Sequence, residues 1–275
     1  VTTDRVSAFD HVLGTIPFKG QILTEIANFW FEKTKDIVPN HIISSPDPQV
    51  LVAKKAETLP VEVIVRGYIT GSLWREYEQG INGQYGFMLP EGLKKDQKFD
   101  SPILTPSTKA EYGEHDEPIA RDAIVNGLVE ESIYAQAEEY ALKLFVAGQE
   151  WAAKQGLILV DTKYEFGMVN GELIVIDEIH TPDSSRYWIA DDYEARFNAG
   201  EGQNMLDKEN IRQWLIERGF SGEGTPPALT DEIRVSLAER YIELYTKLTG
   251  QDFHPKLGDV KSRINNNLEK AGIYA

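Results

Sequence analysis

The sequence predicts an α+β fold, in which strands come early and in one late hairpin while helices lie between and after them. Apolar runs rich in β-branched residues, over 61–69 and 157–160, are typical of buried strands. Apolar residues recur at helical spacing over 130–154, which indicates a long helix. The pair Asn170-Gly171 separates two apolar runs and is a strong hairpin signal. The chain lacks the regular strand–helix alternation of a doubly wound sheet, and it contains neither a P-loop nor a GxGxxG motif.

The individual elements follow from local patterns. A helix is expected where apolar residues recur every three or four positions, as Ile22, Ile26 and Phe29 do. Loops are expected where Pro, Ser, Gly and Asp cluster. In chain order the sequence predicts turns with short apolar pieces over 4–20, a helix over 23–33, a loop over 40–50, strands over 50–55 and 61–69, a helix over 71–78, an irregular region over 79–120, a helix over 130–154, a strand from 157, its partner over 172–179, helices over 208–218 and 231–248, and an exposed helical tail from 258 onward.

Composition narrows the class of function. The chain has 275 residues, enough for one large domain or two lobes, and 44 acidic against 28 basic residues give a net charge of −16. Such a charge disfavours binding to nucleic acid or to anionic membranes. There is no Cys, which excludes disulfides and thiolate chemistry, and no apolar run is long enough to span a bilayer. With no Cys and no visible signal peptide, we expect a cytoplasmic protein, and the sequence leaves its oligomeric state open.

Charged residues flank the predicted hairpin. Lys163 and Glu165 stand on its first strand, and Asp177 follows its second strand. Buried charges are unfavourable unless they are paired or bound to a metal ion. These residues could form a solvated ion pair on a sheet face. Alternatively, the two carboxylates could belong to a site that binds a metal ion and a nucleotide. The apolar strands 157–160 and 173–176 favour the metal–nucleotide site, because the charged residues directly follow strands that are expected to be buried.

The hairpin register limits this interpretation. A two-residue Asn-Gly turn places Glu165 opposite Ile176 and Tyr164 opposite Asp177. Side chains alternate between faces, so regular pairing would put Glu165 and Asp177 on opposite sides of the sheet. If both carboxylates bind one metal ion, the ladder must end or bulge before Glu165, and we expect that it does.

Three other segments carry groups suited to phosphate. Residues 181–188 form a Pro-Asp turn with two serines and Arg186, whose planar fork suits a phosphate group. Arg66 lies within an apolar strand and needs a partner, while Gly71-Ser72 is either an anion site at a helix start or an ordinary N-cap. Lys109 could meet a transferring phosphoryl group. His115 could act as a base, although a lone His is more often a structural hydrogen-bonder.

Taken together, five motifs resemble the SAICAR synthetase (phosphoribosylaminoimidazole-succinocarboxamide synthase) family. They are DRVSAFD (4–10), LPVEVIVRGYITGS (59–72), TPSTKAEYGEHDE (105–117), LVDTKYEFG (159–167) and VIDEIHTPDSSRYW (175–188), and the resemblance runs from Thr3 to about Leu248. It implies an ATP-dependent ligase of de novo purine biosynthesis. Such an enzyme joins L-aspartate to carboxyaminoimidazole ribonucleotide through an acyl phosphate, with Mg²⁺ as cofactor.

The resemblance also implies a two-lobed fold, with a kinase-like or ATP-grasp-like nucleotide lobe containing an antiparallel sheet and a larger α/β lobe. Residues 1–58 would be the remainder of the small nucleotide-binding lobe, and residues 59–275 would form the larger lobe that binds substrate and metal. Family members carry a glycine-rich hairpin over the ATP phosphates, upstream of the position of Val1, and we expect such a segment to precede it.

Individual roles are carried over from the family motifs. Asp4, Ser7 and Asp10 lie in a motif near the acceptor site, without individual roles. The resemblance implies that Lys163, Lys109, Glu165 and Asp177 are catalytic, that Glu165 and Asp177 hold the metal ion, that Arg66, Ser72, Asp116, Ser185, Arg186 and Arg212 bind the ribonucleotide, and that Lys55, Glu57, Glu62, Lys109, Glu165 and Asp177 bind ATP.

Two other functions fit the same residues. A small-molecule kinase would use the same lysine and carboxylates but would stop after phosphoryl transfer. A nucleotide-binding module without turnover is the non-enzymatic alternative. Aspartate distinguishes the first rival, since a ligase consumes it together with ATP and a kinase ignores it. Nucleotide binding without product formation by the full-length polypeptide would favour the second.

Overall fold

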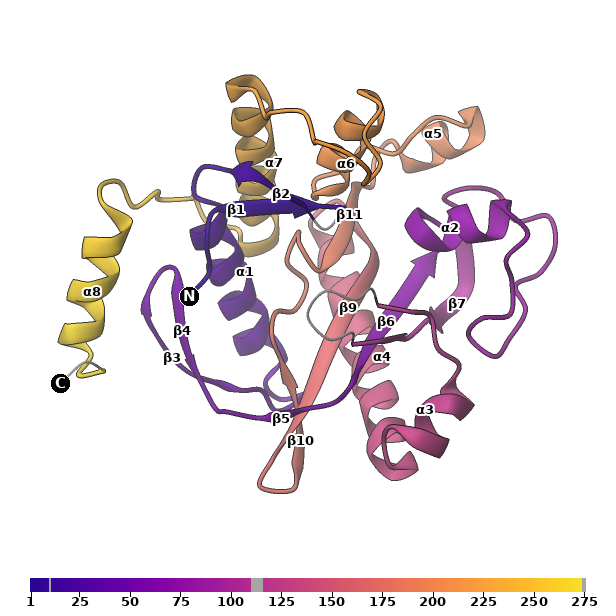
Figure 1. Cartoon of the computed structure of the whole chain (residues 1–275), viewed down its shortest axis with the longest axis horizontal. Coiled ribbons are helices and arrows are strands. Elements are labelled where there is room, and N and C mark those ends of the chain that lie inside the picture. Colours follow the sequence, from indigo (N-terminus) through magenta and orange to yellow (C-terminus); the bar gives the residue numbers. More distant parts are fainter. Residues whose placement is uncertain (10, 110–115, 274–275) are drawn as a thin grey trace.

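A computed structural model describes residues 1–9, 11–109 and 116–273, and its mixture of helices and strands confirms the α+β class (Figure 1). The main sheet is built around β9 (Leu157–Val169), a strand of 13 residues. Within the described ranges this sheet has seven strands, and its neighbouring strands are antiparallel. The strands beside β9 are β5 (Glu57–Thr58), β6 (Val61–Tyr68), β10 (Glu172–Ile176) and β11 (Ser185–Ile189), and β6 also pairs with β7 (Lys98–Leu104) and β8 (Ser107–Thr108).

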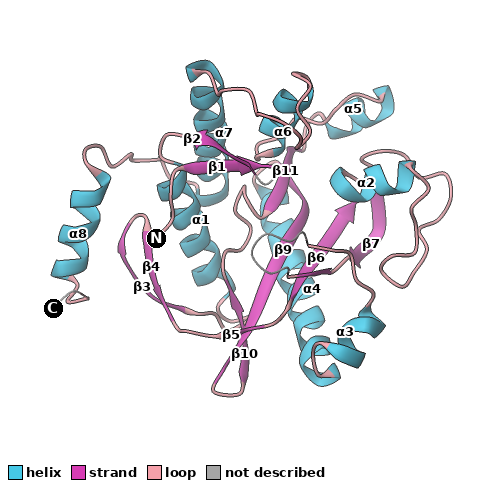
Figure 2. Cartoon of the chain, viewed as in Figure 1, coloured by secondary structure: helices cyan, strands magenta, loops and turns pink. Residues whose placement is uncertain are grey.

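Long helices bury one face of the sheet. The helix α4 (Glu131–Lys154) packs against β6, β9 and β10 and runs behind β9 in Figure 2. Its apolar stripe enters a core that it shares with α1 (Lys19–Thr34) and α7 (Asp231–Thr249), which pack on each other. The shorter helices are α2 (Gly71–Glu78), α3 (Arg121–Gly127), α5 (Tyr193–Ala199), α6 (Glu209–Ile216) and α8 (Val260–Lys270). None of the described helices is both long and apolar enough to cross a membrane.

Most predicted elements are confirmed. The helices expected over 71–78, 130–154 and 231–248 appear as α2, α4 and α7 with ends within one residue. The Asn170-Gly171 hairpin forms in the predicted register, with Glu172 opposite Val169. Both turn residues have positive φ, 53° and 83°, as a type I′ turn requires.

Short elements account for most of the errors, and two of them are the helices α3 and α5, which were not predicted. Residues 40–50 were predicted as loop, but β3 (Ile42–Asp47) pairs with β4 (Val50–Ala53). The region 79–120 was predicted as irregular, but it contains β7 and β8. The first segment contains β1 (Arg5–Ala8) and β2 (His11–Thr15), and the loop after β10 leads into β11. Pro46 and Pro102 lie inside β3 and β7, where Pro argues against a strand unless the strand lies at an edge.

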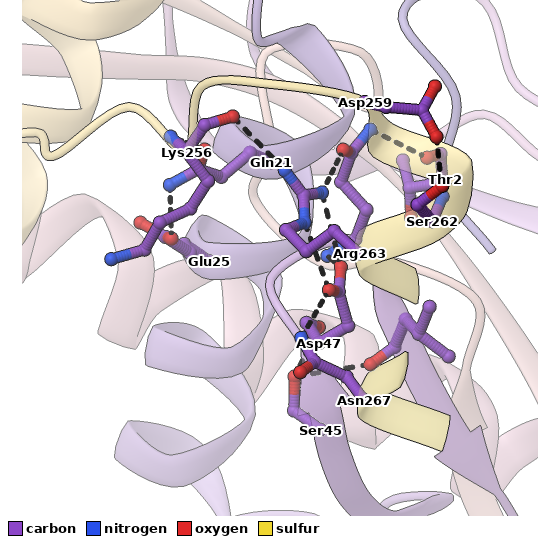
Figure 3. Close-up of polar contacts among 12 residues, drawn as sticks. Thr2, Gln21, Glu25, Ser45, Asp47, Lys256, Asp259, Ser262, Arg263 and Asn267 are labelled. Atoms are coloured by element: carbon purple, nitrogen blue, oxygen red, sulfur yellow. Dashed lines mark hydrogen bonds and ion pairs between the residues drawn. The ribbon is translucent and has the colours of Figure 1, made fainter. Parts of the chain in front are cut away.

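The helix α8 is tied to the body by polar contacts. Asp47, at the end of β3, is fully buried and accepts hydrogen bonds from Arg263 Nε at 3.0 Å and Asn267 Nδ2 at 2.7 Å (Figure 3). Arg263 also donates to Gln49 Oε1, and Gln49 Nε2 donates to the carbonyl oxygen of Thr2. The expected helical tail is therefore confirmed, and one face of it is fixed to the β3–β4 ribbon.

Candidate active site

A pocket of about 480 Å³ lies where β6, β9 and β11 run side by side. It gathers residues from segments far apart in the sequence, including the start of α2 and the region just before α6. Many of the predicted site residues line this pocket, namely Glu62, Arg66, Ser72, Asp116, Lys163, Ser185, Arg186 and Arg212.

One buried carboxylate organises two guanidinium groups in the pocket wall. Asp161 of β9 lies opposite Arg66 of β6, and each of the two residues is only 4% exposed. Asp161 Oδ2 accepts from Arg66 Nη1 at 3.0 Å and from Arg186 Nη1 at 2.5 Å. Arg66 also donates to Thr105 Oγ1 at 2.8 Å and to Ser72 Oγ at 3.2 Å. The partner that the sequence required for Arg66 is therefore Asp161, a residue that was not predicted as part of the site.

The start of α2 adds to the same wall. Gly71 has φ 60°, and a Cβ at this position would lie 2.4 Å from Arg186 Nη2, so a larger residue would be strained here and would displace the Arg186 guanidinium group. The preceding residue, Thr70, makes no side-chain capping hydrogen bond to the helix. The Thr70 side chain therefore does not cap the first N–H groups of α2, and the Arg186 guanidinium lies against Gly71, the first residue of the helix. Together with the Ser72 hydroxyl, these donors suit an anion.

A second cluster lies at the edge of the pocket, around Lys163. Its Nζ donates to Glu62 Oε1 at 3.0 Å and to Glu165 Oε1, and it lies 3.6 Å from Asp177 Oδ2. Lys109 Nζ donates to the other oxygen of Glu165. The cluster therefore contains two ammonium groups and three carboxylates, all of which were predicted as site residues.

The cluster is strongly coupled by charge. Burial opposes the charge of Lys163, but the carboxylates of Glu165, Glu62 and Asp177 outweigh it and raise the pKa of Lys163. Burial likewise opposes the charge of Glu165, but Lys163 and Lys109 outweigh it and lower the pKa of Glu165. The pKa of Asp177 is raised, first by burial and then by Glu165. Glu165 is therefore the more firmly ionised of these two carboxylates, and a further cation would favour ionisation of Asp177.

The two carboxylates converge by a route that differs from the prediction. The ladder was expected to end or bulge before Glu165, and this is wrong, because regular pairing continues through Ile176 opposite Glu165. Asp177, the first residue after β10, instead adopts a left-handed conformation with φ 64°. This conformation turns the backbone out of the strand, and the Asp177 carboxylate comes within 3.6 Å of Lys163 Nζ, which also bonds Glu165. The pattern of the sequence gives no signal for such a turn, since Asp is only one of several residues that tolerate it.

Other predicted residues lie outside these two groups. Lys55 and Glu57 are exposed, and Glu57 pairs with Met168 near the hairpin end of β9, away from the pocket lining. His115 and Asp10 fall outside the described residues. Asp4 Oδ1 accepts from the backbone N–H of Gly20 at 2.8 Å, which fixes the first turn of α1.

Several pocket residues were not predicted individually. Asp183 accepts from Lys19 Nζ at 2.7 Å and from the Tyr241 hydroxyl at 3.0 Å. Lys208 lies nearby, and burial lowers its pKa despite the opposing charge of Asp183. In the sequence, Asp183 is part of an ordinary Pro-Asp turn, and no motif around Lys208 indicates a functional site. The further residues lining the pocket are Phe9, Ile64, Arg75, Asp161, Thr162, Pro182, Ser184 and Asp207.

No group of three or more His, Cys, Asp or Glu side chains that could hold a metal ion is found among the described residues. The predicted metal ligands are the two carboxylates of Glu165 and Asp177. Two carboxylates supply hard oxygen ligands, and Mg²⁺ in nucleotide sites is commonly held by one or two carboxylates together with phosphate oxygens and water. The side chains present therefore fit Mg²⁺ bound jointly with a nucleotide.

Comparisons with known proteins point to one family. Residues 1–227 match the family model described as SAICAR synthetase. Phosphoribosylaminoimidazole-succinocarboxamide synthase of Bacteroides fragilis is 51% identical over 273 residues, covering 98% of this chain and 87% of that protein.

Solved structures give the same result. SAICAR synthase from Saccharomyces cerevisiae, complexed with SAICAR, aligns with a TM-score of 0.79 at 35% identity, covering 91% of this chain and 88% of that one. A SAICAR synthetase in complex with ADP aligns with a TM-score of 0.69 at 27% identity, covering 92% and 90%. The extent of the family match and the identity to the Bacteroides protein establish that this chain belongs to the SAICAR synthetase family.

Proposed function

We propose that this chain catalyses the ATP-dependent ligation of L-aspartate to the carboxylate of carboxyaminoimidazole ribonucleotide, giving the succinocarboxamide, ADP and phosphate in de novo purine biosynthesis. The observation that carries the proposal is that two groups of charged side chains lie next to each other. A lysine–carboxylate cluster at Lys163 borders a pocket whose wall holds Arg66 and Arg186 on one buried aspartate. The names of the relatives and the two ligands in their structures support the same reaction.

The ribonucleotide phosphate would bind at the arginine wall. Arg66, Ser72 and Arg186 would grip it, with Ser185 adjacent and Arg212 reaching it from α6. Arg66 and Arg186 both donate to the Asp161 carboxylate, which holds their two guanidinium groups side by side in the pocket wall, an arrangement that suits a phosphate group. Asp116 would help to place the imidazole, at the same end of the pocket as Glu62.

ATP would bind at the lysine–carboxylate cluster. Glu165 and Asp177 would hold Mg²⁺ with the phosphates, and Lys109 would contact the nucleotide phosphates. The adenine would lie at the hinge around 57–62, with Lys55, Glu57 and Glu62 as nucleotide contacts. When bound, Mg²⁺ would neutralise the charge that develops on the transferring phosphoryl group. This arrangement also explains how a chain with a net charge of −16 can bind a triphosphate.

The chemistry follows from the needs of a carboxylate. A carboxylate oxygen of the imidazole attacks the γ-phosphorus of ATP, the bond to the bridging oxygen breaks, and ADP leaves. The resulting acyl phosphate is attacked at its carbonyl carbon by the neutral amine of aspartate. Phosphate leaves with the electron pair of the broken C–O bond, and the nitrogen loses one proton to solvent as the amide forms. Lys163 would stabilise charge at the reacting carboxylate, and the protein otherwise positions the reactants. No covalent enzyme intermediate is needed.

We further propose a two-lobed organisation. Residues 1–58 would be the remainder of a small, kinase-like or ATP-grasp-like nucleotide-binding lobe, and residues 59–275 the larger substrate- and metal-binding lobe. The β3–β4 ribbon lies in the first range and most of the main sheet in the second, while α1 packs on α7 across this boundary. We place the enzyme in the cytoplasm, with small molecules as its partners.

The test is an ADP-release assay with the carboxylated ribonucleotide, with and without aspartate. The ligase should release one ADP for each aspartate consumed and form the succinocarboxamide. ADP release that is unaffected by aspartate would mean a kinase, and nucleotide binding with no release in either case would mean a binding module.

A further inference from the structure

A buried contact joins β9 to the turn that follows β10. Tyr164 stands between Lys163 and Glu165, so its side chain points to the opposite face of the strand from both. Tyr164 and His180 are each 0% exposed, and the Tyr164 hydroxyl oxygen lies 2.5 Å from His180 Nε2. Strand β9, which carries Lys163 and Glu165, is thus hydrogen-bonded to the segment that follows Asp177.

His180 is held from several sides. The ring of Trp30 on α1 lies edge-on to the imidazole, with centroids 4.5 Å apart. On the side of α4, a Cβ at Gly148 would lie 2.6 Å from His180 Cε1, so the helix approaches as closely as glycine permits. The Tyr187 hydroxyl donates to the His180 carbonyl oxygen at 2.8 Å. The imidazole therefore contacts α1, α4 and β9, and Tyr187 of β11 holds the backbone of the same residue.

The turn between β10 and this histidine needs such a support. Both of its ends are left-handed, with φ 64° at Asp177 and φ 55° at His180. Each left-handed residue other than glycine is unfavourable by about 1 kcal/mol or more, so the turn persists only where its surroundings hold it. The same backbone conformation at Asp177 brings its carboxylate toward Lys163 and Glu165.

We propose that Tyr164 and His180 are positioning residues that set the placement of Asp177 relative to Glu165. The proposal rests on the proposed function, because the consequence of this placement is the geometry of a cation shared with the nucleotide phosphates. Tyr164 adjoins Glu165 in β9, and His180 is three residues from Asp177, so one buried hydrogen bond spans the backbones that carry the two carboxylates.

The variant Tyr164→Phe removes only the hydroxyl. Its matched control is Tyr134→Phe, because Tyr134 on α4 is also 0% exposed and, among the described side chains, its hydroxyl is one of the buried groups without a hydrogen-bond partner. The probe is Mn²⁺, which prefers the same oxygen ligands as Mg²⁺, titrated with ADP and followed by electron paramagnetic resonance. Tyr164→Phe should weaken Mn²⁺ binding about tenfold, as is typical when a group that orients a metal ligand is lost, and Tyr134→Phe should change it less than about twofold.

Circular dichroism must show both variants folded at the temperature of the titration. Equal Mn²⁺ affinity in Tyr164→Phe and wild type, or an equal loss in the two variants, would overturn the positioning role. If Tyr164→Phe does not fold, Gly148→Ala decides, because it presses on the imidazole from α4 and leaves the Tyr164 hydroxyl in place; a wild-type Mn²⁺ affinity there overturns the proposal. Failure of the proposed function would appear separately, as a wild-type protein that does not consume aspartate.

Discussion

The Asp161 carboxylate lies 3.0 Å from the Arg66 guanidinium, and both side chains are only 5% exposed. A buried ion pair adds little to stability by itself, because desolvation offsets most of the attraction. Removing one partner is different, since the other charge stays buried without compensation. The pair therefore links the stability of the β6–β9 ladder to the shape of the proposed phosphate site.

Replacing Asp161 tests this link. Asp161→Asn should lower the free energy of unfolding by about 3–5 kcal/mol and raise the KM of the ribonucleotide, because Arg66 and Arg186 lose the negative charge that they share. Urea denaturation and steady-state kinetics measure the two effects. Glu139→Gln is the control, since Glu139 pairs with Lys143 on the surface of α4, and it should change stability by less than about 1 kcal/mol. A small loss at Asp161, similar to that of the control, would contradict the structural role given to the pair.

The lysine–carboxylate cluster gives a second prediction. Lys163→Ala and Asp177→Asn should each lower kcat about 10³-fold or more, because each removes a charge that acts on the transferring phosphoryl group or the reacting carboxylate. Circular dichroism should show a native fold for both, since Lys163 is 27% and Asp177 49% exposed. Lys98→Ala, at an exposed position of β7, should keep the wild-type rate. A near-normal rate in either cluster variant would refute the role given to that residue.

The sequence predicts the long elements of this fold well, for physical reasons. The helix α4 has a sustained apolar stripe, and the hairpin has an Asn-Gly turn, so both are determined by local patterns. The strands β3 and β7 contain Pro and alternate poorly, so the sequence resembles loop there. β7 receives its hydrogen bonds from the distant strand β6, while β3 pairs with the adjacent β4 and is held by Arg263 and Asn267 of α8. Local sequence patterns do not indicate such contacts with distant segments.

Some residues of the candidate site can be predicted from local sequence, and others cannot. Lys163, Glu165 and Arg186 stand in motifs that are chemically unusual beside apolar strands, and the sequence is sufficient to single them out. Asp161 has the same kind of setting, but its importance depends on lying opposite Arg66, which is a matter of strand register between distant segments. The left-handed turn at Asp177 depends on contacts made by His180 and could not be read from the hairpin itself.

Acid should weaken the fold through His180. Burial lowers the pKa of His180 to about 3 from its ordinary value of 6.5, so the folded protein binds this proton less readily than the unfolded chain. The contribution of neutral His180 to the free energy of unfolding is thus fully present above pH 6.5 and is lost as pH falls toward 3. The loss reaches about 3 kcal/mol at pH 4.5. His180→Phe, which cannot be protonated, should show a smaller loss of stability between pH 6.5 and 4.5 in urea titrations. His254→Asn, an exposed control, should keep the wild-type slope, and equal slopes in all three proteins would contradict the prediction.

The anchor of α8 gives the last prediction. Arg263→Ala leaves the Asp47 carboxylate, whose side chain is fully buried, without its cationic partner, and this should lower stability by about 3 kcal/mol and release the helix from the β3–β4 ribbon (Figure 3). Lys261→Ala, on the exposed face of the same helix, is the matched control and should change little. Limited proteolysis between α7 and α8 reports the release directly, since cleavage there should accelerate in Arg263→Ala alone. Because Gln49 connects Arg263 to Thr2 and Asp4, hydrogen exchange should also rise at the N-terminal segment, and unchanged exchange there would mean that the network ends at the ribbon.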